Sequence, residues 1–310
     1  MTTPRDMSKR PPRDPGDLSV DLKYYMFDWD DNILHMPTRI HLERRTENGW
    51  EPYEVSTAEF ARIRRDTENY RPREGDWDKA FVDFYDVGER GEDAFLEDTK
   101  AALAPVIAGE RGGAPSYDAF RQALVEGRLF AIITARSHSS RAIRKGVEYF
   151  VRDVLSPDER REMIANLRFY AARFDGNEAS LSDDQILENY LALNKYHGVT
   201  SPEFEERMGR KTKGSESPEE AKQIAIKDFV RHVIAMMRGG VARGDSVSIG
   251  FSDDDQKNVE AVRAFINAEL KKEFPHIKFV VYDTSDPTRH NGHKMVISGD
   301  TTARDDTQHG

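Results

Sequence analysis

Short apolar runs alternate with longer amphipathic stretches along the chain. The short runs are apolar or β-branched and end in polar residues, which is typical of buried strands. They lie at residues 24–27, 129–134, 246–251, 279–282 and 294–298. Stretches with apolar side chains at helical spacing lie at residues 139–155, 217–237 and 258–274. This alternation predicts an α/β fold with a Rossmann-like parallel sheet as its core.

Two long, charged segments interrupt the alternation, at residues 35–125 and 156–216. Helices are expected in them at residues 58–70, 79–87, 92–107, 117–127 and 184–196. We therefore expect a core of residues 21–34, 126–155 and 217–298, a largely helical cap over 35–125, and a second insertion over 156–216. The polar ends, 1–20 and 299–310, are expected to be disordered tails.

Composition narrows the class of protein. The chain has 310 residues, no cysteine and a net charge of −10. The negative charge argues against general affinity for nucleic acid or anionic membranes, and no apolar run approaches the about 18 residues that a membrane span requires. The absence of cysteine excludes disulfides and thiolate metal sites. The N-terminus has no apolar segment typical of a secretory signal, and we expect a cytoplasmic protein.

Polar side chains follow the first three predicted strands. Asp28 and Asp30 follow the first strand, Thr134 ends the second, and Asp253 and Asp254 follow the third. The carboxyl ends of parallel strands meet at one edge of a sheet, where α/β proteins bind ligands. Lys222 stands near the start of the helix that leads to the third strand. Oxygen ligands, a lysine and a hydroxyl together indicate a Mg²⁺ site that also holds a phosphoryl group.

Four sequence motifs, in order, resemble those of the haloacid dehalogenase (HAD) superfamily of phosphatases. They read MFDWDDNIL, LFAIIT, KQIAIKDF and SVSIGFSDDDQKNVEAV. The resemblance covers the core, roughly residues 22–34, 129–155 and 217–283, and does not cover the two insertions. It implies a HAD-like core with a cap, and a Mg²⁺-dependent phosphatase that acts on a small phosphorylated substrate.

The resemblance also implies roles for individual residues. Asp28 would be the nucleophile that forms an aspartyl-phosphate, and Asp30 the general acid and base. Thr134 and Lys222 would bind the phosphoryl oxygens. The metal would be held by the carboxylate of Asp28, by the backbone carbonyl of Asp30 and by the acidic cluster at 253–254. Asp253 and Asp254 are alternative ligands, since the two ways of aligning the fourth motif differ by one residue.

The chain departs from the family pattern after the second aspartate. Asp31 and Asn32 stand where the family usually has Gly-Thr. Asp tolerates unusual backbone angles better than most residues, and Asn32 can still donate a hydrogen bond. Lys227 is an alternative to Lys222, although it lies one helical turn late in the pattern. Arg136 and His138 follow the second strand and are candidates for contact with substrate.

Other functions are also compatible with the sequence. The chain could be a HAD-fold binding or regulatory module with weak activity, or a phosphatase of nucleic-acid ends or phosphoproteins that uses basic residues at 210–215 or in the N-terminal tail. An EF-hand is not supported, because Ile33 and Arg39 replace the glycine and glutamate that its loop requires.

Overall fold

The computed structural model describes residues 21–85, 93–174, 181–209, 218–237, 246–286 and 288–297. The expected tails, 1–20 and 299–310, and the basic stretch 210–215 lie outside these ranges. The largest element is a six-stranded sheet with strand order β6-β5-β1-β7-β8-β9. Its strands are β1 (Asp21–Phe27), β5 (Phe130–Thr134), β6 (Lys195–Gly198), β7 (Ser246–Asp253), β8 (Lys278–Asp283) and β9 (His293–Ile297).

The sheet is parallel except for β9, which pairs antiparallel with β8. The expected α/β class and the five expected strands are confirmed, and the arrangement is compatible with a Rossmann-like fold. The chain builds outward from β1 through β5 to β6, and then returns to the other side of β1 with β7. The order of the strands therefore reverses between β1 and β7, and such a reversal leaves a crevice at the carboxyl ends of those two strands.

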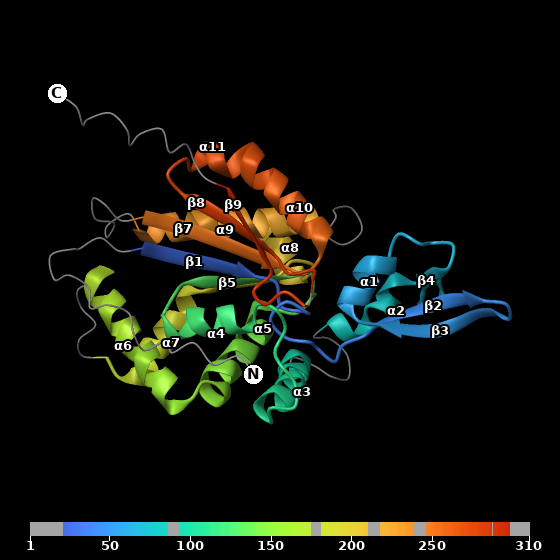
Figure 1. Ribbon diagram of the computed structural model, residues 1–310, viewed down its shortest axis with the longest axis horizontal. Helices are drawn as coiled ribbons and strands as arrows, with labels where there is room; N and C mark the ends of the chain where they lie inside the picture. The colour runs from blue at the N-terminus through green and yellow to red at the C-terminus, as the bar shows by residue number, and fades with distance from the viewer. Residues whose placement is uncertain are drawn as a thin grey trace.

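Helices cover both faces of this sheet (Figure 1). One hydrophobic cluster joins it to α3 (Ala94–Ile107), α4 (Tyr117–Val125), α5 (Ser140–Tyr149), α6 (Pro157–Phe174) and α7 (Asp183–Leu193). The cluster on the opposite face involves α8 (Pro202–Met208), α9 (Pro218–Met237) and α10 (Gln256–Phe265). Beyond α10 a π-helical turn over Ile266–Leu270 leads into α11 (Lys271–Glu273). The alternation of side chains along buried strands supplies both clusters.

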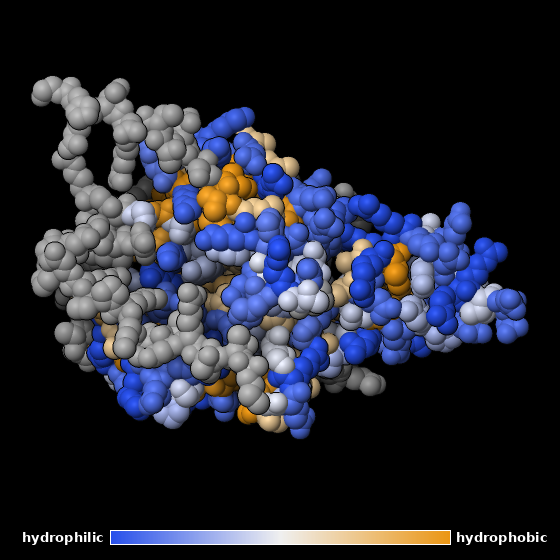
Figure 2. All heavy atoms as spheres, in the orientation of Figure 1, coloured by the Kyte–Doolittle hydropathy of each residue, from blue (hydrophilic) through white to orange (hydrophobic). Residues whose placement is uncertain are grey.

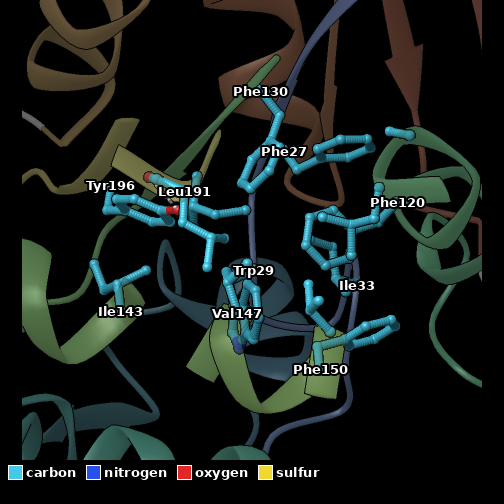
Figure 3. Packing of buried hydrophobic residues seen from close by; sticks show 14 of the residues in the cluster. Phe27, Trp29, Ile33, Phe120, Phe130, Ile143, Val147, Phe150, Leu191 and Tyr196 are labelled. Carbon is cyan, nitrogen blue, oxygen red and sulfur yellow. Dashed lines mark hydrogen bonds between the residues drawn. The ribbon is translucent and has the colours of Figure 1, made fainter. Parts of the chain in front are cut away.

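Trp29 lies at the centre of the first cluster. Its ring packs 5.3 Å from the ring of Phe95 and 5.9 Å from that of Phe120, measured between centroids. Figure 3 shows it among side chains from β1, β5, α4 and α5. Because Trp29 is fully buried, it fixes the backbone between Asp28 and Asp30. The two carboxylates on either side of it are thereby held at the sheet edge.

Residues 40–84 form a separate small unit that projects beyond the carboxyl end of β1 (Figure 1). An antiparallel sheet of β2 (Ile40–Thr46), β3 (Gly49–Val55) and β4 (Tyr70–Pro72) packs against α1 (Thr57–Ile63) and α2 (Trp77–Ala80). Its own apolar cluster is small and includes Ile40, Leu42, Val55, Ala80 and Phe84. Its visible surface is mostly hydrophilic (Figure 2).

The expectation that residues 35–125 are mostly helical is therefore wrong in the first half. The helix expected at 58–70 ends at Ile63, and that expected at 79–87 is replaced by α2 and a short 3-10 turn, with 86–87 outside the described residues. The physical reason is a hairpin: Glu47 and Asn48 join β2 to β3, and Gly49, the first residue of β3, takes a φ of +113° that favours glycine. Ile40 and Leu42 alternate with polar residues, as one-sided strands require.

The second insertion also extends the main sheet. The helix expected at 184–196 ends at Leu193, because residues 195–198 form β6 beside β5. Asn194 makes this junction, since its side chain accepts a hydrogen bond from Phe130 N and donates one to Tyr190 O, both at 2.8 Å. Within the described ranges, no helix has the length and apolar character to cross a bilayer.

Candidate functional site

Lys222 joins two carboxylates at the point where the strand order reverses. Asp28 follows β1 directly, Asp253 ends β7, and Lys222 lies in the second turn of α9. Nζ of Lys222 donates to Asp28 Oδ1 at 2.9 Å and to Asp253 Oδ2 at 2.6 Å. All three side chains are buried. Buried charges are stable only when paired, and the two carboxylates compete here for one ammonium group.

Asp254 adds a third carboxylate to this pair. Oxygens of Asp28, Asp253 and Asp254 all lie within 4.8 Å of one another. Asp253 also accepts hydrogen bonds from Asp255 N and from the Asn258 side chain, at 2.9 and 3.1 Å. Within the described part of the chain, the carboxylate of Asp254 accepts no hydrogen bond and forms no ion pair.

Burial raises the pKa of Asp28 well above its usual range, against the opposing attraction of Lys222. Burial and the charges of Asp28 and Asp253 likewise raise the pKa of Asp254. The pKa of Lys222 is also raised: burial lowers it, but the attraction of Asp253 and Asp28 outweighs that effect. Three carboxyl groups thus face one lysine, which is too little positive charge to favour their ionised forms together.

These residues fit a divalent cation. Hard cations such as Mg²⁺ prefer carboxylate oxygens, and Asp254 offers a carboxylate that no described group satisfies. A cation would lower the repulsion that raises the pKa of Asp28 and Asp254. The geometry of the three carboxylates is therefore compatible with Mg²⁺.

The carboxylate of Asp30 binds Arg136 and not Lys222. Arg136 holds this carboxylate with two hydrogen bonds, from Nε to Oδ2 at 2.8 Å and from Nη2 to Oδ1 at 2.6 Å. Oγ1 of Thr134 donates to Asp30 Oδ2 at 3.3 Å. Phe84 and Phe95 flank the guanidinium, with ring centroids 4.7 and 5.5 Å from its carbon. In this arrangement both Asp30 oxygens are occupied.

The two residues that depart from the family pattern have structural roles. Asp31 adopts a φ of +50°, the left-handed conformation that glycine usually supplies. Its carboxylate accepts from Thr57 Oγ1 at 2.7 Å and from Ala58 N at 3.1 Å, which ties the loop after β1 to α1. These hydrogen bonds, and one from His35, lower its pKa despite its burial.

Asn32 links four segments of the chain. Its amide nitrogen donates to Asp28 O at 2.9 Å and to Ser252 Oγ at 3.0 Å. Its amide oxygen accepts from Ser116 Oγ at 2.9 Å and from Thr284 Oγ1 at 2.8 Å. The expectation that Asn32 donates a hydrogen bond is confirmed, and the side chain fixes Asp28 relative to β7.

The fold brings the site residues that the sequence predicts to one edge of the sheet. Asp28, Asp253, Asp254 and Lys222 form one group, with Asp30 and Thr134 beside it. Lys227 does not belong to the group, because its Nζ pairs with Glu269 at 3.0 Å.

The pairing of Arg136 with Asp30 could not be predicted from the sequence. The position of Arg136 after β5 suggested contact with substrate, but its guanidinium is 1% exposed and bound to Asp30. The tertiary pairing of residues 106 positions apart leaves no local pattern. An arginine two residues after the strand that ends in Thr134 was the only available signal.

A cleft of about 930 Å³ opens beside the carboxylates. Asp31 and Asp254 line it from the loops that follow β1 and β7, and residues of α1 line it from the small unit. The group of carboxylates is therefore reached from a space that both parts of the chain enclose.

Comparisons with protein-family models, with curated proteins and with solved structures found no significant match to this chain.

Proposed function

We propose that the protein is a Mg²⁺-dependent phosphatase that hydrolyses a phosphate monoester through an aspartyl-phosphate on Asp28. The observation that carries the proposal is the position of Asp28 at the strand-order reversal, 2.9 Å from Lys222 and grouped with Asp253 and Asp254. The four ordered motifs that resemble the HAD superfamily support the same assignment. Buried carboxylates beside a lysine at such a crevice are suited to phosphoryl transfer.

The chemistry assigned to the chain has two displacements. A carboxylate oxygen of Asp28 attacks phosphorus, and the bond between phosphorus and the ester oxygen breaks. Lys222 and Thr134 balance the charge of the phosphoryl oxygens. Water then attacks phosphorus, which releases inorganic phosphate and regenerates Asp28. Mg²⁺, held by Asp28, Asp254 and Asp253, would supply electrostatic stabilisation to the transferring group.

Asp30 is assigned the proton transfers. It would donate a proton to the leaving oxygen and take one from the attacking water. Since both of its oxygens accept hydrogen bonds from Arg136, Arg136 has to release one of them before Asp30 can reach a substrate oxygen. Arg136 also bonds to Thr38 and packs on Phe84, at the two connections to the small unit. Movement of the small unit would change this pairing.

The small unit is proposed to act as the cap. It borders the cleft through α1 and is tied to the loop after β1 through Asp31. A substrate enclosed between the two parts would be shielded from water, which strengthens electrostatic interactions with it. This position favours a small phosphorylated substrate.

The test is release of inorganic phosphate from para-nitrophenyl phosphate, with Mg²⁺ or with a chelator. Asp28→Asn is compared with Asp184→Asn, whose side chain is 89% exposed on α7. We expect turnover that needs Mg²⁺ and is lost by a factor of about 10³ or more in Asp28→Asn, as for loss of a nucleophile. Asp184→Asn should keep full activity. Near-normal turnover in folded Asp28→Asn would disprove the mechanism.

A second candidate function is a binding module without turnover. The observation that favours it is the occupation of both Asp30 oxygens by Arg136. In that case phosphate or its analogue vanadate would bind in a Mg²⁺-dependent manner, while no substrate would be hydrolysed. Calorimetric titration of both anions, alongside the activity assay, separates the two functions.

A further inference from the structure

Arginines gather in the cleft that borders the carboxylate group. Arg39 precedes β2, Arg62 and Arg65 lie at the end of α1, and Arg111 lies between α3 and α4. All four line the same cleft as Asp254, and all four are exposed. They come from three separate segments of the chain, so one local charge run does not explain them.

These four guanidinium groups have no acidic partner among the residues that the structure describes. Arg64, which lies between two of them, differs: it bonds to Asp255 at 3.0 Å and approaches Glu219 at 3.6 Å. Several arginines elsewhere pair with carboxylates, as Arg121 does with Glu159 at 2.7 Å, while single exposed arginines such as Arg45 have no acidic partner among the described residues. In a chain with a net charge of −10, the gathering in one cleft of four arginines that form no ion pair with a described residue is a specific local feature.

Five arginines and one lysine line this cleft against four carboxylates, those of Asp31, Asp254, Asp255 and Glu260, so an anionic ligand would neutralise the positive charge that remains. Arginine binds phosphate and carboxylate in bidentate geometry, and a phosphoryl group carries about −1.5 to −2 at neutral pH. A carboxylate would leave more of the positive charge uncompensated. The chemistry of the cleft therefore favours a phosphoryl group over a carboxylate.

We propose that the substrate carries two phosphoryl groups: one is transferred at Asp28, and the second is bound by the arginines of the cleft. This inference rests on the proposed function for the first group only. It narrows the substrate class to small organic bisphosphates. The cleft volume of about 930 Å³ lies within the range of about 300–1,000 Å³ that is usual for small-molecule sites.

The test measures binding without turnover. Wild-type protein with Mg²⁺ is titrated calorimetrically with methylphosphonate and with alkane bisphosphonates of graded spacer length, none of which can be hydrolysed as a phosphate ester. We expect one spacer length to bind about tenfold or more tighter than methylphosphonate. Arg62→Ala/Arg65→Ala should remove most of that gain and leave methylphosphonate affinity within about twofold.

The matched control is Arg45→Ala. Arg45 is exposed on β2 of the same small unit but does not line the cleft. It should keep the full gain in affinity, which separates a site in the cleft from a general effect of positive charge.

Each outcome decides the inference. A gain that depends on Arg62 and Arg65 supports it, even if para-nitrophenyl phosphate is not hydrolysed and the proposed function fails. Equal affinities for methylphosphonate and every bisphosphonate overturn it, even if phosphatase activity is found. A 5′-phosphorylated oligonucleotide that binds about tenfold tighter than every bisphosphonate would overturn the assignment to small molecules and favour nucleic-acid ends.

Discussion

Arg136 and Asp30 form a buried bidentate pair, with N–O distances of 2.8 and 2.6 Å. The pair lies where the small unit joins the main sheet, because Arg136 also donates to Thr38 Oγ1 at 2.5 Å. The next residue, Ser137, donates its backbone N–H to Phe84 O at 3.0 Å. The proposed general acid is therefore held by a residue that also contacts both connections to the small unit.

Replacing Arg136 should destabilise the fold strongly. Arg136→Met leaves the Asp30 carboxylate buried without its partner, and such a loss costs about 3–5 kcal/mol. Arg121→Met is the matched control, since Arg121 pairs with Glu159 but both side chains are partly exposed, 34% and 27%. Its loss should cost about 1 kcal/mol or less. The measurement is urea unfolding of both variants, and equal costs would contradict a structural role for the buried pair.

Asp31 should anchor the small unit through α1. Asp31→Gly suits the φ of +50° but removes the acceptor of Thr57 Oγ1 and Ala58 N. We expect a loss of about 0.5–2 kcal/mol, as for other helix-capping groups. Hydrogen exchange at Ala58 and through α1 should become faster, while Asp31→Asn, which keeps an acceptor oxygen, should change less. Unaltered exchange in Asp31→Gly would mean that other contacts hold the unit.

The main sheet could be predicted because its strands are buried. Buried parallel strands are continuous apolar runs, such as residues 129–134, and each of the five was recognised. β6 was missed, because its four residues, KYHG, have no apolar pattern of their own. It is a strand because Asn194 ends α7 and β5 offers it a partner.

The small unit was harder to predict because its strands are exposed. Only Ile40 and Leu42 are buried on β2, and β3 buries Val55 alone. Charged side chains dominate the rest, so the segment resembled charged helices. Asn48-Gly49 was the signal that should have indicated a hairpin.

The site residues that lie at the ends of strands could be predicted from the sequence. Asp28, Thr134 and Asp253 follow from the parallel sheet, and Lys222 follows from the motif order. The bidentate pair with Arg136 depends on tertiary contacts, as do the hydrogen bonds of Asn32 to Ser252, Ser116 and Thr284. Sequence spacing carries no information about such contacts.

Gly198 should be required for the loop that carries Arg136. A Cβ at this position would lie 2.2 Å from His138 O and 2.8 Å from Arg136 O, and backbone atoms cannot move aside cheaply. We expect Gly198→Ala to cost about 1–3 kcal/mol, as overpacking usually does. Gly112→Ala is the control, because nothing lies within 4 Å of its Cβ position. Thermal unfolding of both variants checks the difference, and similar values for the two would refute the close approach.

His197 should make stability depend on pH. Burial, then the positive charges of Arg207 and Lys195, hold its pKa well below the usual value of 6.5. Arg207 donates to His197 Nδ1 at 2.7 Å, which requires an unprotonated nitrogen there. The unfolded chain takes up a proton near pH 6.5, while the folded chain does not. The stabilisation is therefore complete above about pH 6.5 and is lost as the pH falls below it, by up to about 1.4 kcal/mol per pH unit.

The check on His197 is urea unfolding between about pH 5 and 7.5. His197→Gln should reduce the slope of stability against pH in this range, because it removes the group that differs between the two states. The exposed His276→Gln serves as control and should keep the wild-type slope. An unchanged slope in His197→Gln would show that other groups cause the pH dependence.

The carboxylate of Asp254 should destabilise the folded chain without metal and stabilise it when Mg²⁺ is bound. Its pKa is raised by burial and by the charges of Asp28 and Asp253, so the ionised carboxylate is unfavourable in the folded chain without a cation. In a chelator, Asp254→Asn should therefore be as stable as wild type or more stable. With Mg²⁺ at about 100 times its Kd, wild type should gain about 2.7 kcal/mol from binding.

Asp254→Asn should lose most of that gain, so the order of stability of the two proteins changes with Mg²⁺. Asp255→Asn is the control, because Asp255 bonds to Arg64 and to Lys257 N and lies outside the carboxylate group. Its basal stability can fall, but its gain from Mg²⁺ should match that of wild type. The measured quantity is this gain, from thermal unfolding with Mg²⁺ and with chelator. The same gain in all three proteins would place any bound Mg²⁺ away from Asp254, since removal of a ligand must weaken binding at its own site.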